Sequence, residues 1–177
     1  MKSSTSPSAS GAARRALLRL SALLATAVMG LGSLPALASG PYGRIIVDVA
    51  PLEAKGLGGY ARVVQGVVEA AAAKSFAGDV LPGRCGLPSL IIEISGVSLS
   101  AYAGGGGVRP NSSGPSNDSM SGRLLTEADG RIVAAIPMLS ALPATSGGAW
   151  YAPDFDRRRL RALAEHFTWW SRRKLGD

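Results

Sequence analysis

The amino-acid sequence predicts an α+β fold, a two-layer sandwich in which two helices cover one face of a four-stranded mixed sheet. Two observations lead to this prediction: the order of the patterns along the chain and the single apolar stripe of each helical pattern. A strand pattern is followed by a long helical pattern, three strand patterns then follow in succession, and a second helical pattern closes the chain, which gives the order β-α-β-β-β-α. Each helical pattern has a single apolar stripe, so each helix has one face to bury against a sheet.

The first strand and the first helix are predicted from the spacing of apolar residues. Residues 44–49 (RIIVDV) are mostly apolar and β-branched and are closed by Pro51, which predicts a strand. Residues 60–77 predict a helix, and Gly78 is a common residue just after a helix end. The apolar stripe of this helix is expected at Tyr60, Val63, Val64, Val67, Val68 and Ala71.

The remaining strands are expected to form an antiparallel meander. Residues 90–99, 119–127 and 131–136 predict the second, third and fourth strands, and Ala128-Asp129-Gly130 predicts a tight turn before the last of them. Pro137 cannot donate a backbone hydrogen bond to a neighbouring strand. We therefore expect the fourth strand to end there or to lie at a sheet edge.

The C-terminal helix is predicted for residues 155–174, with Asp154 as its N-cap. Its apolar stripe is expected at Leu160, Leu163, Phe167 and Trp170. Trp169 lies roughly 100° from Trp170 around the helix axis, at the edge of the stripe or beyond it. The stripe is expected to dock on the sheet with the arginines solvated.

The last turns of this helix carry the best candidate for a contact surface. Trp169 with Arg172, Arg173 and Lys174 combines an aromatic ring with basic side chains. That combination suits an anionic membrane surface or an acidic partner. Basic residues here also complement the helix dipole, which requires no partner.

The first 38 residues have the parts of a secretory signal peptide. Basic residues precede an apolar run at 20–34, and Pro35-Ala36-Leu37-Ala38 supplies a small-residue cleavage site. We expect a cleaved signal peptide and a periplasmic or secreted bacterial protein, exported by the Sec route, with the twin-arginine route as the alternative. Residues 39–177 would form a single exported domain with a flexible Gly/Ser/Pro/Asn loop at about 103–118 and no membrane-spanning stretch.

The charge of the chain is concentrated at its two ends. Four of the 19 basic residues lie in the first 38 residues, which leaves 15 against 12 acidic residues. Seven of those 15 lie in the C-terminal helix. A nucleic-acid binder needs a broad basic face, so no nucleic-acid partner is expected.

Two carboxylates interrupt apolar strand patterns, Asp48 in the first strand and Glu93 in the second. If these strands are neighbours, the two carboxylates can share a face, where such a pair does acid–base work or holds a cation. The alternative is a solvated sheet face on which Arg123 and Arg131 pair with them.

A single cysteine and a single histidine limit the remaining chemistry. Cys85 has no partner for an internal disulfide, so we expect an inert, partly buried thiol, with an intermolecular disulfide or a reactive thiol as the alternatives. His166 stands alone in the sequence, without the clustered ligands that a metal site needs. No metal and no cofactor are predicted.

The stretch Gly56-Leu57-Gly58-Gly59-Tyr60-Ala61 fits the G-x-G-x-x-A pattern of a dinucleotide cradle. In that fold the first glycine follows the strand directly, whereas residues 50–55 intervene here. We interpret the glycines as a connection that starts a helix.

Taken together, these patterns favour a non-enzymatic, exported binding or interaction domain of the bacterial cell envelope. Its partner would be an envelope protein or an anionic membrane surface, bound through the exposed sheet face, the long loop or the basic helix. The chain would be a monomer or a dimer linked through Cys85. The alternative is a small hydrolase or ligand-binding domain that uses Asp48 and Glu93.

Overall fold

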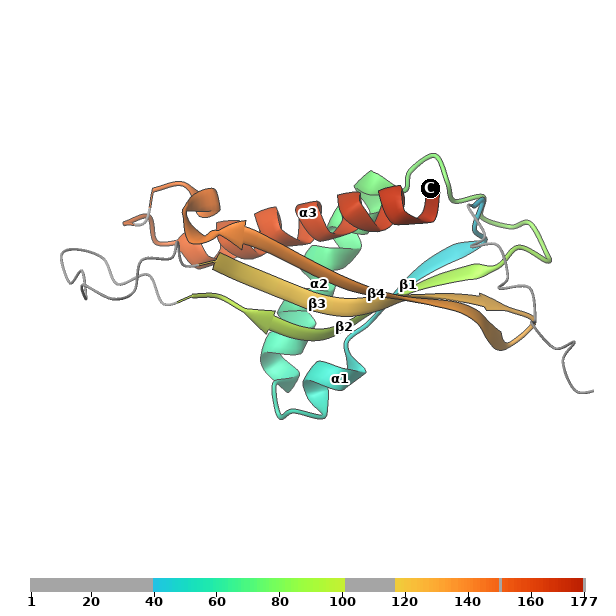
Figure 1. Ribbon diagram of the computed structural model, residues 1–177, viewed down its shortest axis with the longest axis horizontal. Coiled ribbons are helices and arrows are strands. Elements are labelled where there is room, and N and C mark those ends of the chain that lie inside the picture. Colours follow the sequence, from blue (N-terminus) through green and yellow to red (C-terminus); the bar gives the residue numbers. More distant parts are fainter. Residues whose placement is uncertain (1–39, 101–116, 150, 177) are drawn as a thin grey trace, which may run out of the picture. The chain divides into compact units, whose positions relative to one another are not determined.

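A four-stranded sheet with the order β1-β2-β3-β4 is the centre of the fold (Figure 1). The computed structural model describes residues 40–100, 117–149 and 151–176, so the predicted signal peptide and most of the predicted loop lie outside the described residues. β1 and β2 are parallel, whereas β2, β3 and β4 are antiparallel neighbours. The strands are β1 (Arg44–Asp48), β2 (Ser89–Ser98), β3 (Asn117–Ala128) and β4 (Arg131–Pro143). The predicted α+β class and mixed sheet are confirmed.

Two long helices, α2 (Gly58–Ser75) and α3 (Phe155–Gly176), cover the sheet. In Figure 1, α3 runs along the strands, and α2 crosses behind them. Two single turns complete the helices of the described residues: α1 (Ala50–Glu53) precedes α2, and the 3-10 turn η1 (Ala144–Gly147) lies between β4 and α3.

The core lies between the helices and one face of the sheet. Leu90, Ile92 and Ile94 alternate along β2 and are fully buried, and the same cluster includes Val64 from α2 and Phe167 from α3. Because successive strand residues point to opposite faces, this alternation places both helices on the same face. The other face of the sheet carries no described helix.

The buried stripes differ from the predicted ones at their edges. Tyr60 and Val63 were expected in the α2 stripe, but both are exposed. Trp170 was expected in the α3 stripe and is 39% exposed. The buried residues of α2 are Ala61, Val64, Val68, Ala71 and Ala72. Small alanines at these positions let the helix approach the sheet, so the larger side chains remain at the border of the interface.

β4 continues through Pro137 to Pro143, well beyond the predicted end. Pro137 is tolerated because β4 is an edge strand and has a hydrogen-bonded neighbour, β3, on one side only. α1 lies within residues 50–55, between the first strand and the glycines, where the sequence predicted no helix. Pro51 near the start of this turn and the fully buried Leu52 stabilise it, although four residues are too few to show a helical period.

Gly122 allows two strands to approach closely at an irregularity in β2. The register between β2 and β3 shifts between Ile94 and Gly96, which marks a β-bulge. A Cβ atom on Gly122 would overlap the backbone oxygen of Glu93. A side chain at position 122 is therefore incompatible with this strand spacing.

A buried ion pair joins the start of β3 to the first turn of α3. The side chains of Asp118 and Arg159 are each 2% exposed, and Arg159 Nε donates to Asp118 Oδ2 at 2.8 Å. The backbone N–H of Ser100 donates to Asp118 Oδ1 at 2.9 Å, and Arg159 also donates to the Ser100 carbonyl at 2.7 Å. Hydrogen bonds to Asp118 raise the pKa of Arg159 above its usual value. Asp118 had been assigned to the flexible loop at 103–118, but it is the second residue of β3.

Replacing Gly122 with alanine is expected to lower the free energy of unfolding by about 1–3 kcal/mol, because the new methyl group must displace backbone. The matched control is Gly66→Ala in α2, where a Cβ meets no atom within 4 Å. That change should raise the free energy of unfolding by about 0.5–1 kcal/mol through helix propensity. Urea unfolding measures both, and equal effects of the two changes would contradict the predicted clash.

Asp118→Asn is expected to cost about 3 kcal/mol of folding free energy, because Arg159 would lose its buried counter-charge and keep only the exposed Asp156, at 2.9 Å. The control is Glu165→Gln, which removes the exposed pair with Lys74 and should cost about 0.5 kcal/mol or less. The double change Asp118→Leu with Arg159→Met should recover most of the loss. Thermal and urea unfolding provide the values, and equal losses for the two single changes would contradict the prediction.

Candidate functional site

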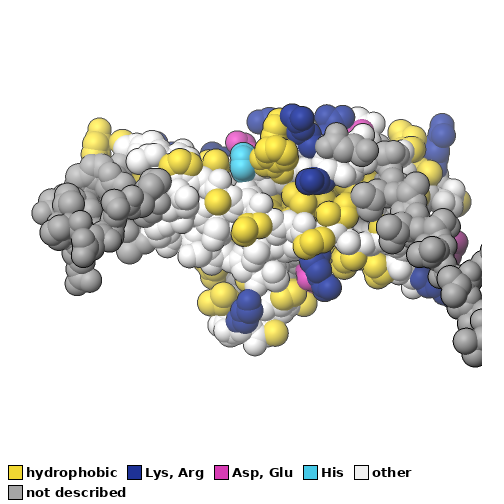
Figure 2. All heavy atoms as spheres, in the orientation of Figure 1, with side chains coloured by type: hydrophobic (Ala, Val, Ile, Leu, Met, Phe, Trp, Pro, Cys, Tyr) yellow, Lys and Arg dark blue, Asp and Glu magenta, His cyan; other side chains and the backbone are white. Residues whose placement is uncertain are grey.

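The C-terminal half of α3 presents two tryptophans to solvent. Trp169 is 48% exposed and Trp170 is 39% exposed, and Leu139 of β4 is 73% exposed. We use the name aromatic–basic patch for Leu139, Trp169, Trp170, Arg173 and Lys174. Figure 2 shows the histidine side chain beside a group of hydrophobic side chains, with Lys and Arg side chains nearby.

Arg173 and the two tryptophan rings form one stacked unit. The rings of Trp169 and Trp170 meet edge to face, with centroids 4.9 Å apart and an angle of 81° between their planes. The guanidinium carbon of Arg173 lies 5.3 Å from the Trp169 centroid and 5.6 Å from the Trp170 centroid. Each distance is within the range of a cation–π interaction. The unit therefore combines exposed apolar area with a positive charge.

The basic charges of the patch are available to a partner. Among the residues that the structure describes, neither Arg173 nor Lys174 has a carboxylate within ion-pair distance. Lys174 and Trp170 line a shallow hollow of about 240 Å³ between α3 and β4, together with Leu139. An anionic group at this hollow would meet an ammonium group and an indole ring together.

His166 orients Trp170 from one turn earlier in α3. The indole Nε1–H of Trp170 donates to His166 Nε2 at 3.0 Å, and His166 Nδ1 lies 2.6 Å from Ser140 Oγ. An indole nitrogen can only donate, so Nε2 carries no proton and the neutral ring carries its proton on Nδ1. Burial lowers the pKa of His166 below its usual value, which favours this neutral form.

Sequence reasoning missed the contact between His166 and Ser140, because strand four was expected to stop at residue 136. Ser140 is only 2% exposed. Its hydroxyl is therefore closed to a substrate, and the Nε2 atom of His166 is already used by Trp170. The pair supports the position of Trp170 and does not present a nucleophile.

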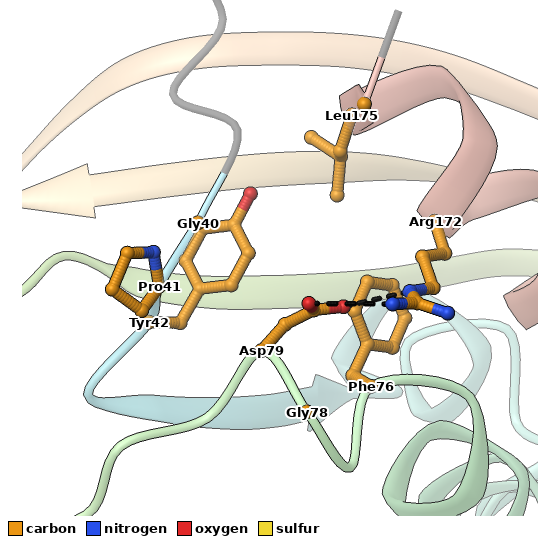
Figure 3. A pocket seen from close by; sticks show the side chains of 9 residues that line it. Gly40, Pro41, Tyr42, Phe76, Gly78, Asp79, Arg172 and Leu175 are labelled. Carbon is orange, nitrogen blue, oxygen red and sulfur yellow. Dashed lines mark hydrogen bonds and ion pairs between the residues drawn. The ribbon is translucent and has the colours of Figure 1, made fainter.

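Arg172, predicted to lie with Trp169 in the contact surface, is directed elsewhere. Its Nε atom donates to Asp79 Oδ2 at 2.7 Å. Both side chains line a different cavity of about 350 Å³, beside Tyr42 and Phe76 (Figure 3). Burial raises the pKa of Tyr42 above its usual value. The charge of Arg172 is therefore neutralised by a structural partner.

Asp48 and Glu93 are paired residues of β1 and β2 and lie on the face of the sheet opposite the core. Arg123 holds Glu93 through two hydrogen bonds, Nε to Oε1 at 2.8 Å and Nη2 to Oε2 at 2.7 Å. These bonds raise the pKa of Arg123. Asp48 Oδ1 accepts the backbone N–H of Ala50 at 2.8 Å, which supports the turn into α1. Both carboxylates thus have structural partners.

Cys85 is exposed and free, which corrects the expectation of a partly buried thiol. It lies in the turn-rich connection between α2 and β2, where no described element covers it. Within the described ranges, no three His, Cys, Asp or Glu side chains gather as a metal site would require. None of the described helices has the length and hydropathy needed to cross a membrane.

The glycines of the G-x-G-x-x-A stretch join two helices. Gly56, with a φ of 81°, follows α1, and Gly58 is the first residue of α2. Lys55, just before them, donates to the Ser95 carbonyl at 2.6 Å. This turn therefore connects α1 to α2 and holds both near the bulge in β2.

Comparison with known proteins gives no family. No protein-family model matches the chain, and no curated protein matches it. One structural match is a crystal structure described as "uncharacterized protein", at 16% sequence identity and a TM-score of 0.39. The match covers 64% of this chain and 62% of the other. A likeness at this level carries no information about function.

The contact between His166 and Trp170 should depend on pH. The pKa of His166 is lowered from 6.5 in the folded chain, so the stabilisation from the neutral ring is complete above about pH 6.5 and is lost as pH falls through the folded value. Protonation places a hydrogen on Nε2, which then cannot accept the indole N–H. We expect tryptophan fluorescence and melting temperature to change together in this window. His166→Gln should remove the shared transition, and a transition that persists in this variant would contradict the assignment.

Proposed function

We propose that this protein is an exported domain of the bacterial cell envelope that binds reversibly to an anionic membrane surface. The contact is the aromatic–basic patch. The observation that carries the proposal is the stacked unit of Trp169, Trp170 and Arg173, which is exposed one residue before Lys174 on the same helix. The proposed location rests on the sequence of residues 1–38, which is typical of a signal peptide.

The residues of the patch suit the boundary between lipid and water. Tryptophan rings prefer the headgroup level of a bilayer, where the apolar ring is buried and the indole N–H stays near polar groups. A Lys or Arg near an anionic bilayer contributes about 1 kcal/mol. Arg173 and Lys174 together would therefore add about 2 kcal/mol to the burial of the rings. The resulting binding is weak, reversible and sensitive to salt.

The shape of the patch favours a lipid surface over an acidic protein. Its members come from one helix side and from the adjoining edge strand, and the hollow between them is small and shallow. A protein partner of high affinity usually anchors a side chain in a desolvated pocket. A bilayer needs only exposed rings and charges on a common surface, which is the arrangement here.

Binding to vesicles tests the proposal. The full protein, recovered after export, should bind phosphatidylglycerol/phosphatidylcholine vesicles and should bind pure phosphatidylcholine vesicles much less. Raising the salt from about 0.1 M to about 1 M shortens the Debye length from about 10 Å to about 3 Å and should largely abolish the preference. Arg173→Gln with Lys174→Gln should weaken anionic binding by about tenfold or more. Co-sedimentation and a blue shift of tryptophan fluorescence measure the binding.

The matched control removes the same charge from the other end of α3. Arg157→Gln with Arg161→Gln changes two exposed arginines outside the patch. These changes should leave binding within about twofold, because roughly 12 Å or more of helix rise separates them from Trp169, which exceeds the Debye length of about 10 Å at 0.1 M salt. Trp169→Ala should weaken binding, whereas Arg172→Gln should not, because Arg172 is paired with Asp79. Equal losses in the two double variants, or no binding at low salt, would overturn the proposal.

A further inference from the structure

The face of the sheet opposite α2 and α3 carries an apolar row that crosses all four strands. Ile46, Ile91, Leu125 and Ala135 are successive register partners from β1 to β4. The first three are partly exposed and Ala135 is exposed. We call this surface the open face. An apolar row of this kind loses contact with water if another surface covers it.

Charged residues flank the apolar row on both sides. One flanking row runs through Asp48, Glu93 and Arg123, which are register partners in β1, β2 and β3. The other runs through Arg44, Ser89 and Glu127 in the same strands. Along the direction from Arg44 to Asp48, the open-face side chains of β1 are positive at Arg44, apolar at Ile46 and negative at Asp48. The β3 side chains in the same three rows are negative at Glu127, apolar at Leu125 and positive at Arg123.

We propose that a second copy of this chain packs on the open face, with a two-fold axis along the apolar row. Rotation about this axis places each strand over the same strand of the partner. Each flanking row then faces the other flanking row of the partner. Arg44 then lies opposite the partner's Asp48, and Arg123 lies opposite the partner's Glu127. Symmetry repeats each of these pairings, so four opposite-charge contacts surround a shared apolar centre. The face is self-complementary in both charge and hydrophobicity.

The charge pattern selects this axis over the alternative. A two-fold axis parallel to the strands would place β1 over β4 of the partner. Asp48 would then face the partner's Pro137, and Arg44 would face the partner's Ile132, so both charges would be covered by apolar groups. Neither charge would gain a counter-charge from the partner, and Arg44 would keep only its 4.0 Å ion pair with Glu127 of the same chain. Covering charges in this way is costly. The arrangement with the axis along the row avoids that cost.

The β4 edge of the sheet is a poorer place for a second copy than the open face. β4 is an exposed edge strand, but Pro137 lies near its middle and cannot donate to an added strand. Packing through the open face follows the usual geometry of a sandwich, with sheets about 10 Å apart and strands aligned within about 30°. Both α3 helices then face outward, so Trp169, Trp170, Arg173 and Lys174 stay accessible in each copy. Leu139 alone of the patch lies on the open face, as the register partner of Ser121. The membrane contact through the α3 side chains is thus separate from the dimer contact.

Sedimentation equilibrium of the full protein, recovered after export and kept under reducing conditions, tests the dimer. Reduction excludes a disulfide through the exposed Cys85. We expect a concentration-dependent dimer. Leu125→Glu places a charge in the apolar row and should raise the dissociation constant at least about tenfold. The control Val63→Glu makes a comparable change on the exposed side of α2 and should leave the dimer unchanged. A monomer at all concentrations, or equal dimerisation of Leu125→Glu, would overturn the proposal.

A charge exchange tests the direction of the axis. Arg44→Asp should weaken the dimer about tenfold, because the new carboxylate faces the partner's Asp48. The double change Arg44→Asp with Asp48→Arg should restore at least part of the affinity, because the pair is re-formed with reversed signs. Circular dichroism melts show whether each variant is folded. A folded double variant that dimerises no better than Arg44→Asp would overturn the two-fold axis along the row.

Discussion

The position of α3 depends on the buried ion pair between Asp118 and Arg159. A charge in the core is tolerated only with a counter-charge and satisfied hydrogen bonds. This pair obtains both from three segments: Ser100 just after β2, the start of β3 and the N-terminal part of α3. The same contact places Arg159 against Gly147 of η1, where no side chain fits. Once the first turn is held there, Leu163 and Phe167 reach the core, and Trp169 and Trp170 reach the surface.

A second constraint on the fold is that α2 and α3 cover the same face of the sheet. β1 ends at the parallel partner of Glu93, and the bulge that follows in β2 requires Gly122 on the opposing strand. Asp48 and Glu93, which the sequence suggested as a possible carboxylate site, therefore lie on the face of the sheet that no described helix covers. Their partners are Arg123 and the Ala50 backbone.

The surface chemistry of α3 is arranged by the tertiary structure. Ser140 of β4, His166 and Trp170 form a short hydrogen-bonded chain from the buried layer to the exposed rings. Arg173 then stacks on both tryptophans, whereas Arg172, its neighbour in sequence, is drawn to Asp79. Two arginines that are equivalent in composition thus have different roles, and only one contributes its charge to the patch.

The sequence predicted the fold class, the order of the main elements, the mixed sheet and an exposed Trp169, because these follow from local spacing along the chain. The spacing of apolar residues and the turn residues carried these predictions, and Pro137 indicated an edge strand. The paired positions of Asp48 and Glu93 also followed once β1 and β2 were neighbours. Local spacing did not predict the contacts of Asp118 with Arg159 or of Ser140 with His166, whose partners lie 41 and 26 residues apart. It also placed Trp170 and Tyr60 on buried stripes. Which side of a helix is buried depends on the shape of the surface it meets, and that surface exists only after β3, β4 and α3 have packed together.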